Sequence, residues 1–265
     1  MMIKLEDLRG HWALVTGASG GIGAEFAREL ARSGVNVVLV GRRAERLQEL
    51  ATRVVHELGV KAEVVRVDLA QPGAVDVVKQ HLQQAGIRIR LLCNIAGMGR
   101  WNRLEHWELN DYREMLEVNN RAVVEMCYHF LPDLASYPSS AVINVSSQAS
   151  YQPVPYMAVY AASKAFVQSF SQALHGEWKE RGILVQTLVP GPTDTEFDAK
   201  AGAYNSALTT RGTTAEVVKA SLAGLAKGDP VVASIKGTYK QRFFAGLFPH
   251  SMVIREVAKM FKPPQ

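Results

Sequence analysis

The sequence is poor in cysteine: Cys93 and Cys127 are the only two in 265 residues, and they do not form a CxxC pair. Buried free thiols are therefore expected in place of a disulfide, a metal site or a thiol nucleophile. The seven histidines are scattered and show no HExxH or comparable ligand spacing. The sequence thus predicts no metal site.

Long hydrophobic runs are also absent. No stretch approaches the roughly 18 uncharged apolar residues that a membrane-spanning helix requires, and residues 1–9 lack the apolar run of a secretory signal. These absences favour a cytoplasmic protein.

No Pro-, Ser- or Gly-rich linker divides the chain, and its 48% hydrophobic and 21% charged residues fit one large α/β domain.

The net charge of +5 is unevenly distributed. Residues 200–265 hold ten basic and three acidic side chains, whereas residues 1–199 hold 20 basic and 22 acidic ones, an acid-leaning balance that argues against a nucleic-acid partner. Residues 238–262 combine Lys and Arg with apolar side chains at near-helical spacing, interrupted by Pro249. This pattern predicts peripheral contact with an anionic membrane, or alternatively a helix packed on a neighbouring subunit or on the fold itself.

Short apolar runs alternate with longer helix-period segments from residue 12 to about 235. This rhythm predicts a single doubly wound α/β domain, with a seven-stranded, mainly parallel sheet and helices on both faces. Strands are expected at residues 12–16, 35–40, 63–67, 91–95, 141–145, 184–188 and 231–234. Helices are expected at residues 21–33, 44–58, 72–85, 107–132, 157–181 and 214–227, with a short insert at 195–209.

A glycine-rich turn, TGASGGIG at 16–23, follows the first predicted strand and opens a helix. Glycine permits φ > 0 and lets backbone approach a pyrophosphate closely, while the helix directs unpaired N–H groups at the phosphates. The same glycines could also serve a purely structural turn. As phosphate-binding residues we predict Gly17, Ser19, Gly21, Ile22 and Gly23.

The second strand ends in Gly41, Arg42 and Arg43. An acid at this point selects an unphosphorylated ribose, whereas arginines suit a 2′-phosphate, so NADP(H) is favoured over NAD(H). Alternatively, the arginines only begin a solvated helix. After the third strand, Asp68 is expected at the adenine edge, although a turn or helix-capping role would also explain it.

Tyr160 and Lys164 lie four residues apart and therefore on one face of the predicted helix. A phenol with a pKa of about 10 needs a neighbouring cation to exchange protons at neutral pH. The pair alone is common by chance. Ser147 lies thirteen residues before the tyrosine. The independent nucleotide-binding signature favours a catalytic role for the pair over a chance occurrence.

In this order the motifs resemble those of the short-chain dehydrogenase/reductase family of the common cytosolic type, over residues 10 to about 235. They are the glycine-rich turn, Asp68-Leu69, Asn94-Ile95-Ala96-Gly97, Asn119, Ser147, Tyr160-x3-Lys164 and Pro190-Gly191-Pro192-Thr193-Asp194-Thr195. The family commonly has asparagine where this chain has Ile95, which puts local hydrogen bonding in doubt. The resemblance implies a Rossmann-type fold.

The resemblance also implies a carbonyl reductase, in which Tyr160 gives a proton to the carbonyl oxygen and Ser147 polarises it. Lys164 would lower the pKa of the tyrosine and hold the nicotinamide ribose, and Asn119 would hold a water. Further cofactor-binding residues implied by the family are Leu69, Asn94, Ala96, Gly97, Pro190, Gly191, Thr193 and Thr195. Residues 1–237 would form the dinucleotide-binding and catalytic domain, with 238–265 as its basic amphipathic extension.

The expected substrate-facing positions are mostly large and apolar, which favours a hydrophobic ketone, aldehyde or acyl chain. They are Met98, Gly99, Trp101, Tyr151, Val154, Tyr156, Phe197 and Tyr204. The tail is also similar to those of family members that act on 3-oxoacyl or steroid-like substrates. The family's usual pairing helices, here 107–132 and 157–181, imply a homodimer or homotetramer. A non-catalytic NADP(H)-binding sensor or scaffold on the same fold is the alternative, but the catalytic set is complete.

Overall fold

The computed structural model describes residues 2–203, 211–234 and 247–263 and contains one seven-stranded sheet of order β3-β2-β1-β4-β5-β6-β7. All six strand pairings are parallel. The strands are β1 (Trp12–Thr16), β2 (Asn36–Gly41), β3 (Ala62–Arg66), β4 (Ile89–Asn94), β5 (Ser140–Val145), β6 (Ile183–Val189) and β7 (Val231–Ala233). The predicted doubly wound fold is confirmed, and each expected strand overlaps an observed one.

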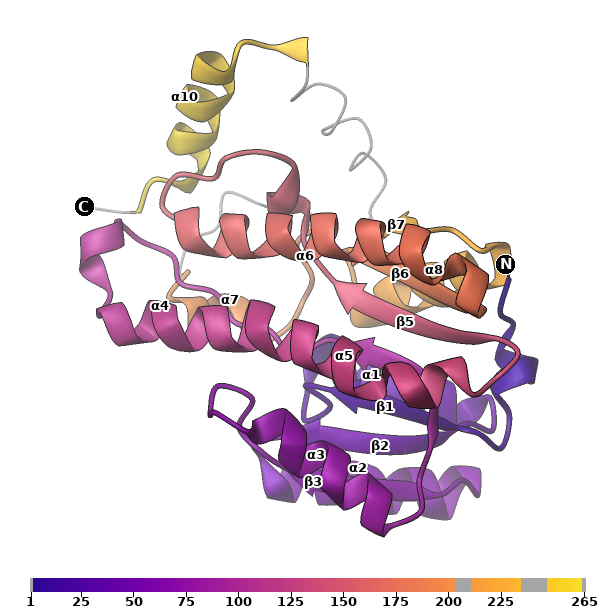
Figure 1. Ribbon diagram of the computed structural model, residues 1–265. Coiled ribbons are helices and arrows are strands. Elements are labelled where there is room, and N and C mark those ends of the chain that lie inside the picture. Colours follow the sequence, from indigo (N-terminus) through magenta and orange to yellow (C-terminus); the bar gives the residue numbers. More distant parts are fainter. Residues whose placement is uncertain (1, 204–210, 235–246, 264–265) are drawn as a thin grey trace.

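Helices cover both faces of the sheet (Figure 1). One face carries α1 (Gly21–Arg32), α2 (Ala44–Leu58) and α8 (Thr214–Lys227), and their apolar sides share one core cluster with the sheet. The other face carries α3 (Ala74–Gln84), α5 (Ala122–Ala135) and α6 (Ala158–Trp178), around a second cluster. Every residue of β6 is buried, which explains why the strands read as unbroken apolar runs rather than as alternating ones.

The helix expected at 107–132 is interrupted. It begins as α4 (Leu109–Leu116), passes through a π-helical turn at Glu117–Arg121 and continues as α5. The turn places the fully buried Asn119 against the loop after β4. A π-turn inserts an extra residue into the helix, and the sequence analysis, which expected one continuous helix, did not detect this shift.

The insert expected at 195–209 contains a short helix, α7 (Phe197–Ala201). Residues 204–210 lie outside the described residues. Further along the chain, α10 (His250–Phe261) begins directly after Pro249, where the sequence predicts a break. The expected piece before this proline lies mostly outside the described residues.

The helix α10 packs on the protein's own surface. Val257 is buried in a cluster with Val154 and Ala161, and the indole N–H of Trp101 donates a 2.8 Å hydrogen bond to the carbonyl of Phe261. Packing on the fold itself is therefore part of the reason for the apolar spacing of this segment. Within the described residues, no helix is both long and apolar enough to cross a membrane.

Both cysteines are free and buried, as expected. Burial raises the pKa of both thiols above its usual value, to about 12 for Cys127, so neither is reactive at neutral pH.

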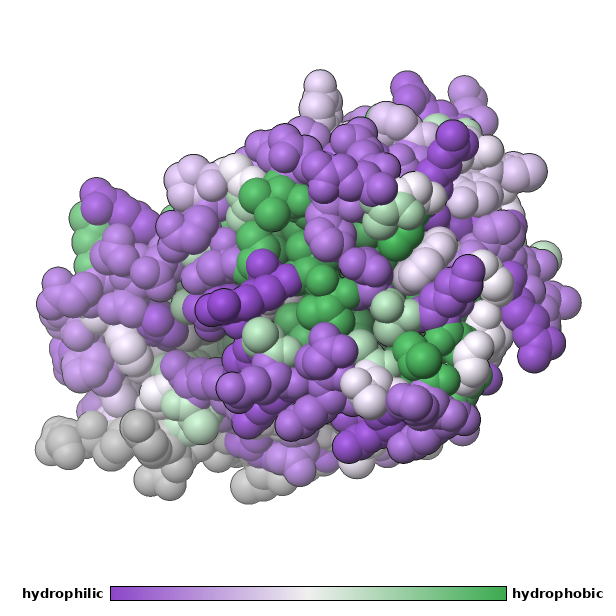
Figure 2. Space-filling model, turned by 90° about the horizontal axis from the view of Figure 1, so that it is seen from below, coloured by the Kyte–Doolittle hydropathy of each residue, from purple (hydrophilic) through white to green (hydrophobic). Residues whose placement is uncertain are grey.

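Seen from the side of α2, α3 and β3, hydrophilic side chains cover most of the surface and surround a central apolar area (Figure 2). Polar outer faces are what amphipathic helices on a buried sheet present to water.

Candidate active site

The sheet winds outward in two directions from β1, which pairs with β2 on one side and β4 on the other. The carboxyl ends of parallel strands form a crevice at such a switch point. Here a cavity of about 1220 Å³ is lined by the loops after β1, β2, β4, β5 and β6. All predicted site residues line it except Asn94 and Asn119.

The glycine-rich turn lies at one end of this cavity. Gly17 has φ = 69°, and a Cβ at this position would lie 3.0 Å from the backbone of Ala96. A Cβ at Gly23 would lie 2.4 Å from the carbonyl oxygen of Gly17, because α1 begins directly on the turn. Both positions therefore require glycine for packing alone. Because these glycines have no side chains, the backbone of the turn on the cavity side is also accessible to a ligand.

The two arginines after β2 have different environments. Arg43 donates from Nε to Ser19 Oγ at 3.2 Å and from Nη2 to the Ser19 carbonyl at 2.8 Å. Arg42 is more exposed and lies 3.7 Å from a carboxylate oxygen of Asp68. Asp68 also accepts a 3.1 Å hydrogen bond from the N–H of Ala70, which shapes the turn after β3.

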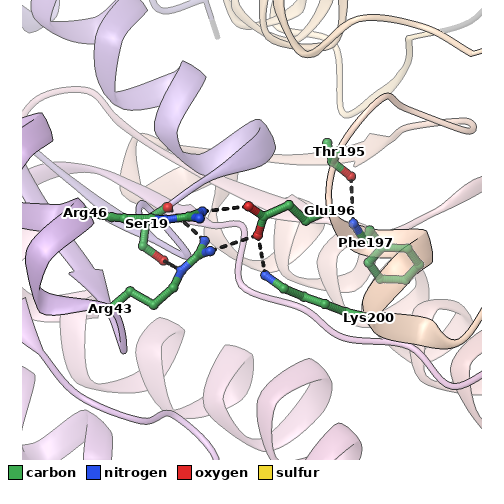
Figure 3. Close-up of polar contacts among 7 residues, drawn as sticks. All are labelled: Ser19, Arg43, Arg46, Thr195, Glu196, Phe197 and Lys200. Carbon is green, nitrogen blue, oxygen red and sulfur yellow. Dashed lines mark hydrogen bonds and ion pairs between the residues drawn. The ribbon is translucent and has the colours of Figure 1, made fainter.

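Arg43 belongs to an ionic cluster that the sequence analysis missed (Figure 3). The Glu196 carboxylate binds Arg43 at 2.8 Å, Arg46 at 2.6 Å and Lys200 at 2.6 Å. The spacing of Arg43 and Arg46, three residues apart at the start of α2, was a signal for a paired cationic site. Glu196 is 150 residues from Arg46, so only the tertiary fold brings it there.

At the other end of the cavity, the hydroxyl of the buried Tyr160 is hydrogen-bonded to the side chain of Ser147. Burial raises the pKa of Tyr160 to about 12, the Ser147 hydrogen bond acts in the opposite direction, and the charge of Asp198 adds to the rise. Lys164 Nζ lies 6.0 Å from the centre of the Tyr160 ring and donates a 2.9 Å bond to the carbonyl of Val145.

In the protein alone the pKa of Tyr160 is raised and not lowered, because desolvation of the phenol dominates; the expected effect of the Lys164 charge stays a prediction. Lys164 is itself affected by the same environment: burial lowers its pKa to about 8. Its ammonium group is held in the site by a hydrogen bond to the backbone carbonyl of Val145.

Asn119 lies behind the cavity wall and joins two segments of it. Its amide oxygen accepts from the N–H of Met98 at 3.0 Å, and its NH₂ group donates to the Met98 carbonyl and to Ser163 Oγ, both at 2.9 Å. A Cβ at Gly97 would lie 3.1 Å from Lys164 Nζ and 3.4 Å from Asn119 Oδ1. The asparagine thus fixes the loop beside the lysine, and its expected water remains a prediction.

Asn94 is also outside the cavity, at the end of β4. Its side chain is buried and donates a 2.8 Å hydrogen bond to Asn144 on β5. The backbone N–H groups of Ile95 and Ala96 donate to Thr16 Oγ1 at 2.9 and 3.0 Å. The hydrogen bonding that Ile95 put in doubt is therefore supplied by Thr16 and Asn144, which the sequence analysis did not single out.

The loop after β6 closes the cavity between its two ends. The Pro190 carbonyl accepts from the N–H of Gln148 at 2.9 Å, and Thr193 Oγ1 donates to the Gly191 carbonyl at 2.9 Å. Thr195 Oγ1 accepts from the N–H of Phe197 at 3.2 Å and so begins α7. These contacts hold the loop in shape, and the cofactor contacts expected of both threonines remain predictions.

The wall around Tyr160 is largely apolar. Of the expected substrate-facing positions, Met98, Gly99, Trp101, Val154 and Phe197 line the cavity, whereas Tyr151 and Tyr156 are outside its lining. Tyr204 lies outside the described residues. The sequence analysis missed the contribution of α10, which adds Met252, Val253, Val257, Met260 and Phe261 to the wall.

Comparison with known proteins agrees with this geometry. The family model described as short chain dehydrogenase matches residues 11–205. The human very-long-chain 3-oxoacyl-CoA reductase is 34% identical over 189 residues, and the mouse 17-beta-hydroxysteroid dehydrogenase type 3 is 36% identical over 183. Each match covers 68% of this chain and 59% of the relative, so the chain spans about three fifths of these relatives' length.

Two solved structures match nearly the whole fold. A short-chain dehydrogenase from Sphingobium yanoikuyae in complex with NADPH has 31% identity and a TM-score of 0.81, and the match covers 89% of this chain and 94% of that one. A 7beta-hydroxysteroid dehydrogenase has 26% identity and a TM-score of 0.86, with 97% and 100% covered. The chain belongs to the short-chain dehydrogenase family.

Proposed function

We propose that this protein is an NADP(H)-dependent oxidoreductase that interconverts a hydrophobic ketone or aldehyde and the corresponding alcohol. The observation that carries the proposal is the buried Tyr160 hydroxyl, bonded to Ser147 on the wall of a cavity that also reaches the glycine-rich turn and Arg43. A proton donor and a dinucleotide site thus share one continuous space.

The residues at the turn fit a phosphorylated dinucleotide. The cavity of about 1220 Å³ exceeds the roughly 300–1,000 Å³ of ordinary small-molecule sites. The turn at Gly17 and the start of α1 would hold the pyrophosphate, and Arg43 would bind the 2′-phosphate. A family member solved with NADPH supports this choice. When bound, the nicotinamide supplies or accepts the hydride.

The protonation states of the site suit carbonyl reduction. With a pKa of about 12, Tyr160 keeps its proton at neutral pH and can donate it to a carbonyl oxygen. Ser147 would donate to the same oxygen and hold it in place. Lys164, with a pKa of about 8, is mostly cationic at pH 7, and its charge would favour the phenolate that remains after proton transfer.

The substrate end supports a hydrophobic substrate. Val154 and Val257 are buried side by side, and Phe197 packs against Tyr160 with ring centres 5.4 Å apart. Arg100 also lines the cavity, but Asp111 binds it at 2.7 Å, so its charge is already balanced. Relatives whose names specify 3-oxoacyl-CoA or hydroxysteroid substrates support the same class.

A screen of NADPH and NADH oxidation, with ketones and aldehydes of graded chain length, tests this proposal. We expect NADPH to be preferred, with kcat/KM rising with apolar length. If NADPH binds without turnover of any carbonyl compound, the non-catalytic sensor would be the better interpretation. A preference for NADH or for short polar ketones would contradict the cofactor or the substrate assignment.

Three further proposals concern the oligomeric state, contact with a membrane and the location of the protein. Tyr128 on α5 and Phe166 on α6 are exposed apolar side chains, which supports a homodimer or homotetramer paired through these helices. Ile254 and Met260 on α10 are exposed as well, which supports peripheral contact with a membrane. The cytoplasmic location expected from the sequence stays a proposal.

A further inference from the structure

The carboxylate of Glu196 forms ion pairs with the cationic side chains at the end of the cavity where the adenosine ribose would bind. In Figure 3 the side chain points toward Arg43, directly before α2, and toward Arg46 on α2, and Lys200 approaches from α7. The three ion pairs measure 2.8, 2.6 and 2.6 Å. Two of these cations come from one side of the cleft, and the anion comes from the other.

Glu196 is ionised under all ordinary conditions. Hydrogen bonds from Lys200, Arg46 and Arg43 hold the pKa of its carboxyl far below its usual value. The group is also about half exposed, with 48% of its side chain accessible. An exposed carboxylate can be exchanged for another anion with little loss of packing.

A 2′-phosphate would compete for the same two guanidinium groups. Arg43 is fixed on the glycine-rich turn by two hydrogen bonds to Ser19, so it remains at this end of the cavity whichever anion it binds. Glu196 accepts one N–H from each arginine, from Arg43 Nη1 and from Arg46 Nη1, and a phosphate dianion would accept from the same donors. Because both are negative, they repel each other when both are close to these arginines.

We propose that Glu196 is a specificity-determining residue for the cofactor, whose carboxylate competes with the 2′-phosphate for Arg43 and Arg46. The inference rests on the proposed NADP(H) function and assigns a role to a residue outside the nucleotide motifs. Glu196 weakens the binding of 2′-phosphorylated ligands and leaves unphosphorylated ones unaffected. It therefore limits the preference for NADP(H) over NAD(H) that the arginines create.

Isothermal titration calorimetry with 2′,5′-ADP and 5′-ADP tests this inference without any turnover. In Glu196→Gln and Glu196→Ala we expect 2′,5′-ADP to bind about three- to tenfold more tightly than in the wild type, and 5′-ADP to bind equally well. Glu57→Gln is the matched control, because it removes the same charge from an exposed ion pair with Arg53 on α2. It should change neither affinity.

The same titrations distinguish a failure of the Glu196 inference from a failure of the proposed NADP(H) binding. Unchanged or weaker 2′,5′-ADP binding in both Glu196 variants would overturn the inference, since the carboxylate would then only position the arginines. If the wild type itself binds 2′,5′-ADP no better than 5′-ADP, the NADP(H) assignment fails and the inference fails with it. Tighter binding in Glu57→Gln as well would assign the effect to net charge and would also overturn it.

Discussion

Lys164 Nζ lies 6.0 Å from the centre of the Tyr160 ring, and its hydrogen bond goes to the carbonyl of Val145 at 2.9 Å. The lysine is therefore held beside the phenol by the backbone of β5. Burial raises the pKa of Tyr160 and lowers that of Lys164. This arrangement gives the first two predictions.

Tyr160→Phe should abolish most turnover and leave cofactor binding intact. The substitution removes the proton donor while keeping the ring that packs on Phe197, and a positioned acid contributes roughly 10²–10⁴-fold to a rate. We expect kcat to fall at least about 100-fold, with the NADPH dissociation constant, measured by fluorescence, within about twofold. Tyr128→Phe on α5 is the control, because its hydroxyl is on an exposed side chain. More than a tenth of wild-type kcat in Tyr160→Phe would contradict the assigned role.

Lys164 should make stability rise with pH above about 8. Its pKa falls from 10.5 in the unfolded chain to about 8 in the folded protein, so between these values the unfolded state binds more protons. The free energy of unfolding then increases by up to about 1.4 kcal/mol per pH unit. Urea unfolding of wild type and Lys164→Met at pH 7 to 10 measures this slope as a difference between the two proteins. The exposed Lys61→Met is the control, and a pH-independent difference for Lys164→Met would contradict the buried charge.

Gly23→Ala should destabilise the protein through the turn. The added Cβ would lie 2.4 Å from the carbonyl oxygen of Gly17, a backbone atom that cannot move aside without shifting β1 or α1. Overpacking of this kind costs about 1–3 kcal/mol. Gly176→Ala is the matched control, because its Cβ meets nothing within 4 Å in the last turn of α6, and helix propensity predicts a gain of up to about 1 kcal/mol. Equal midpoints for the two variants in urea unfolding would rule out this packing argument.

Displacement of the Glu196 carboxylate from the arginines should change the environment of the tryptophans at the substrate end of the cavity. The segment it anchors continues into α7, where the Ala201 carbonyl accepts a 2.8 Å hydrogen bond from Trp101 N and Gly202 packs on the Trp107 ring. We expect 2′,5′-ADP, but not 5′-ADP, to change tryptophan emission, and the change to shrink in Glu196→Gln, where α7 is already released. An identical response to both nucleotides would argue that α7 is not coupled to the phosphate.

The fold could be predicted because a buried parallel strand is a continuous apolar run, and because each chemical motif follows such a run directly. Ser147 follows β5 and Gly17 follows β1, so strand positions alone bring their loops to one edge of the sheet. Element ends were less accurate: β4 begins at Ile89, where residue 91 was expected. Arg90 within it interrupts the apolar pattern, since its side chain leaves the sheet to bind the Ser139 carbonyl.

The parts of the site that could not be predicted depend on contacts between distant segments. Glu196 meets Arg46 across 150 residues, and Asn119 meets Met98 through a π-turn that has no sequence signature. The lowered pKa of Lys164 follows from the depth of the pocket, which spacing on a helix does not reveal. Periodicity did predict an amphipathic α10, but only the structure shows that this helix completes the wall around Tyr160.

The outer side of α10 gives the last prediction. Val257 is buried against the body of the protein, while Ile254 and Met260 are 41% and 50% exposed beside the basic side chains of Arg255 and Lys259. Apolar side chains flanked by basic ones bind anionic bilayers by insertion and by charge. The double variant Ile254→Glu/Met260→Glu should therefore lose flotation with vesicles that contain phosphatidylserine, while Val77→Glu, at an exposed apolar position on α3, should not. Met260 also lines the cavity, whereas Ile254 does not, so carbonyl reduction in solution should persist in the single variant Ile254→Glu, which is tested beside the double one. Flotation that is equal in all three proteins, or absent in the wild type, would leave packing on the fold as the sole reason for the apolar residues of this helix.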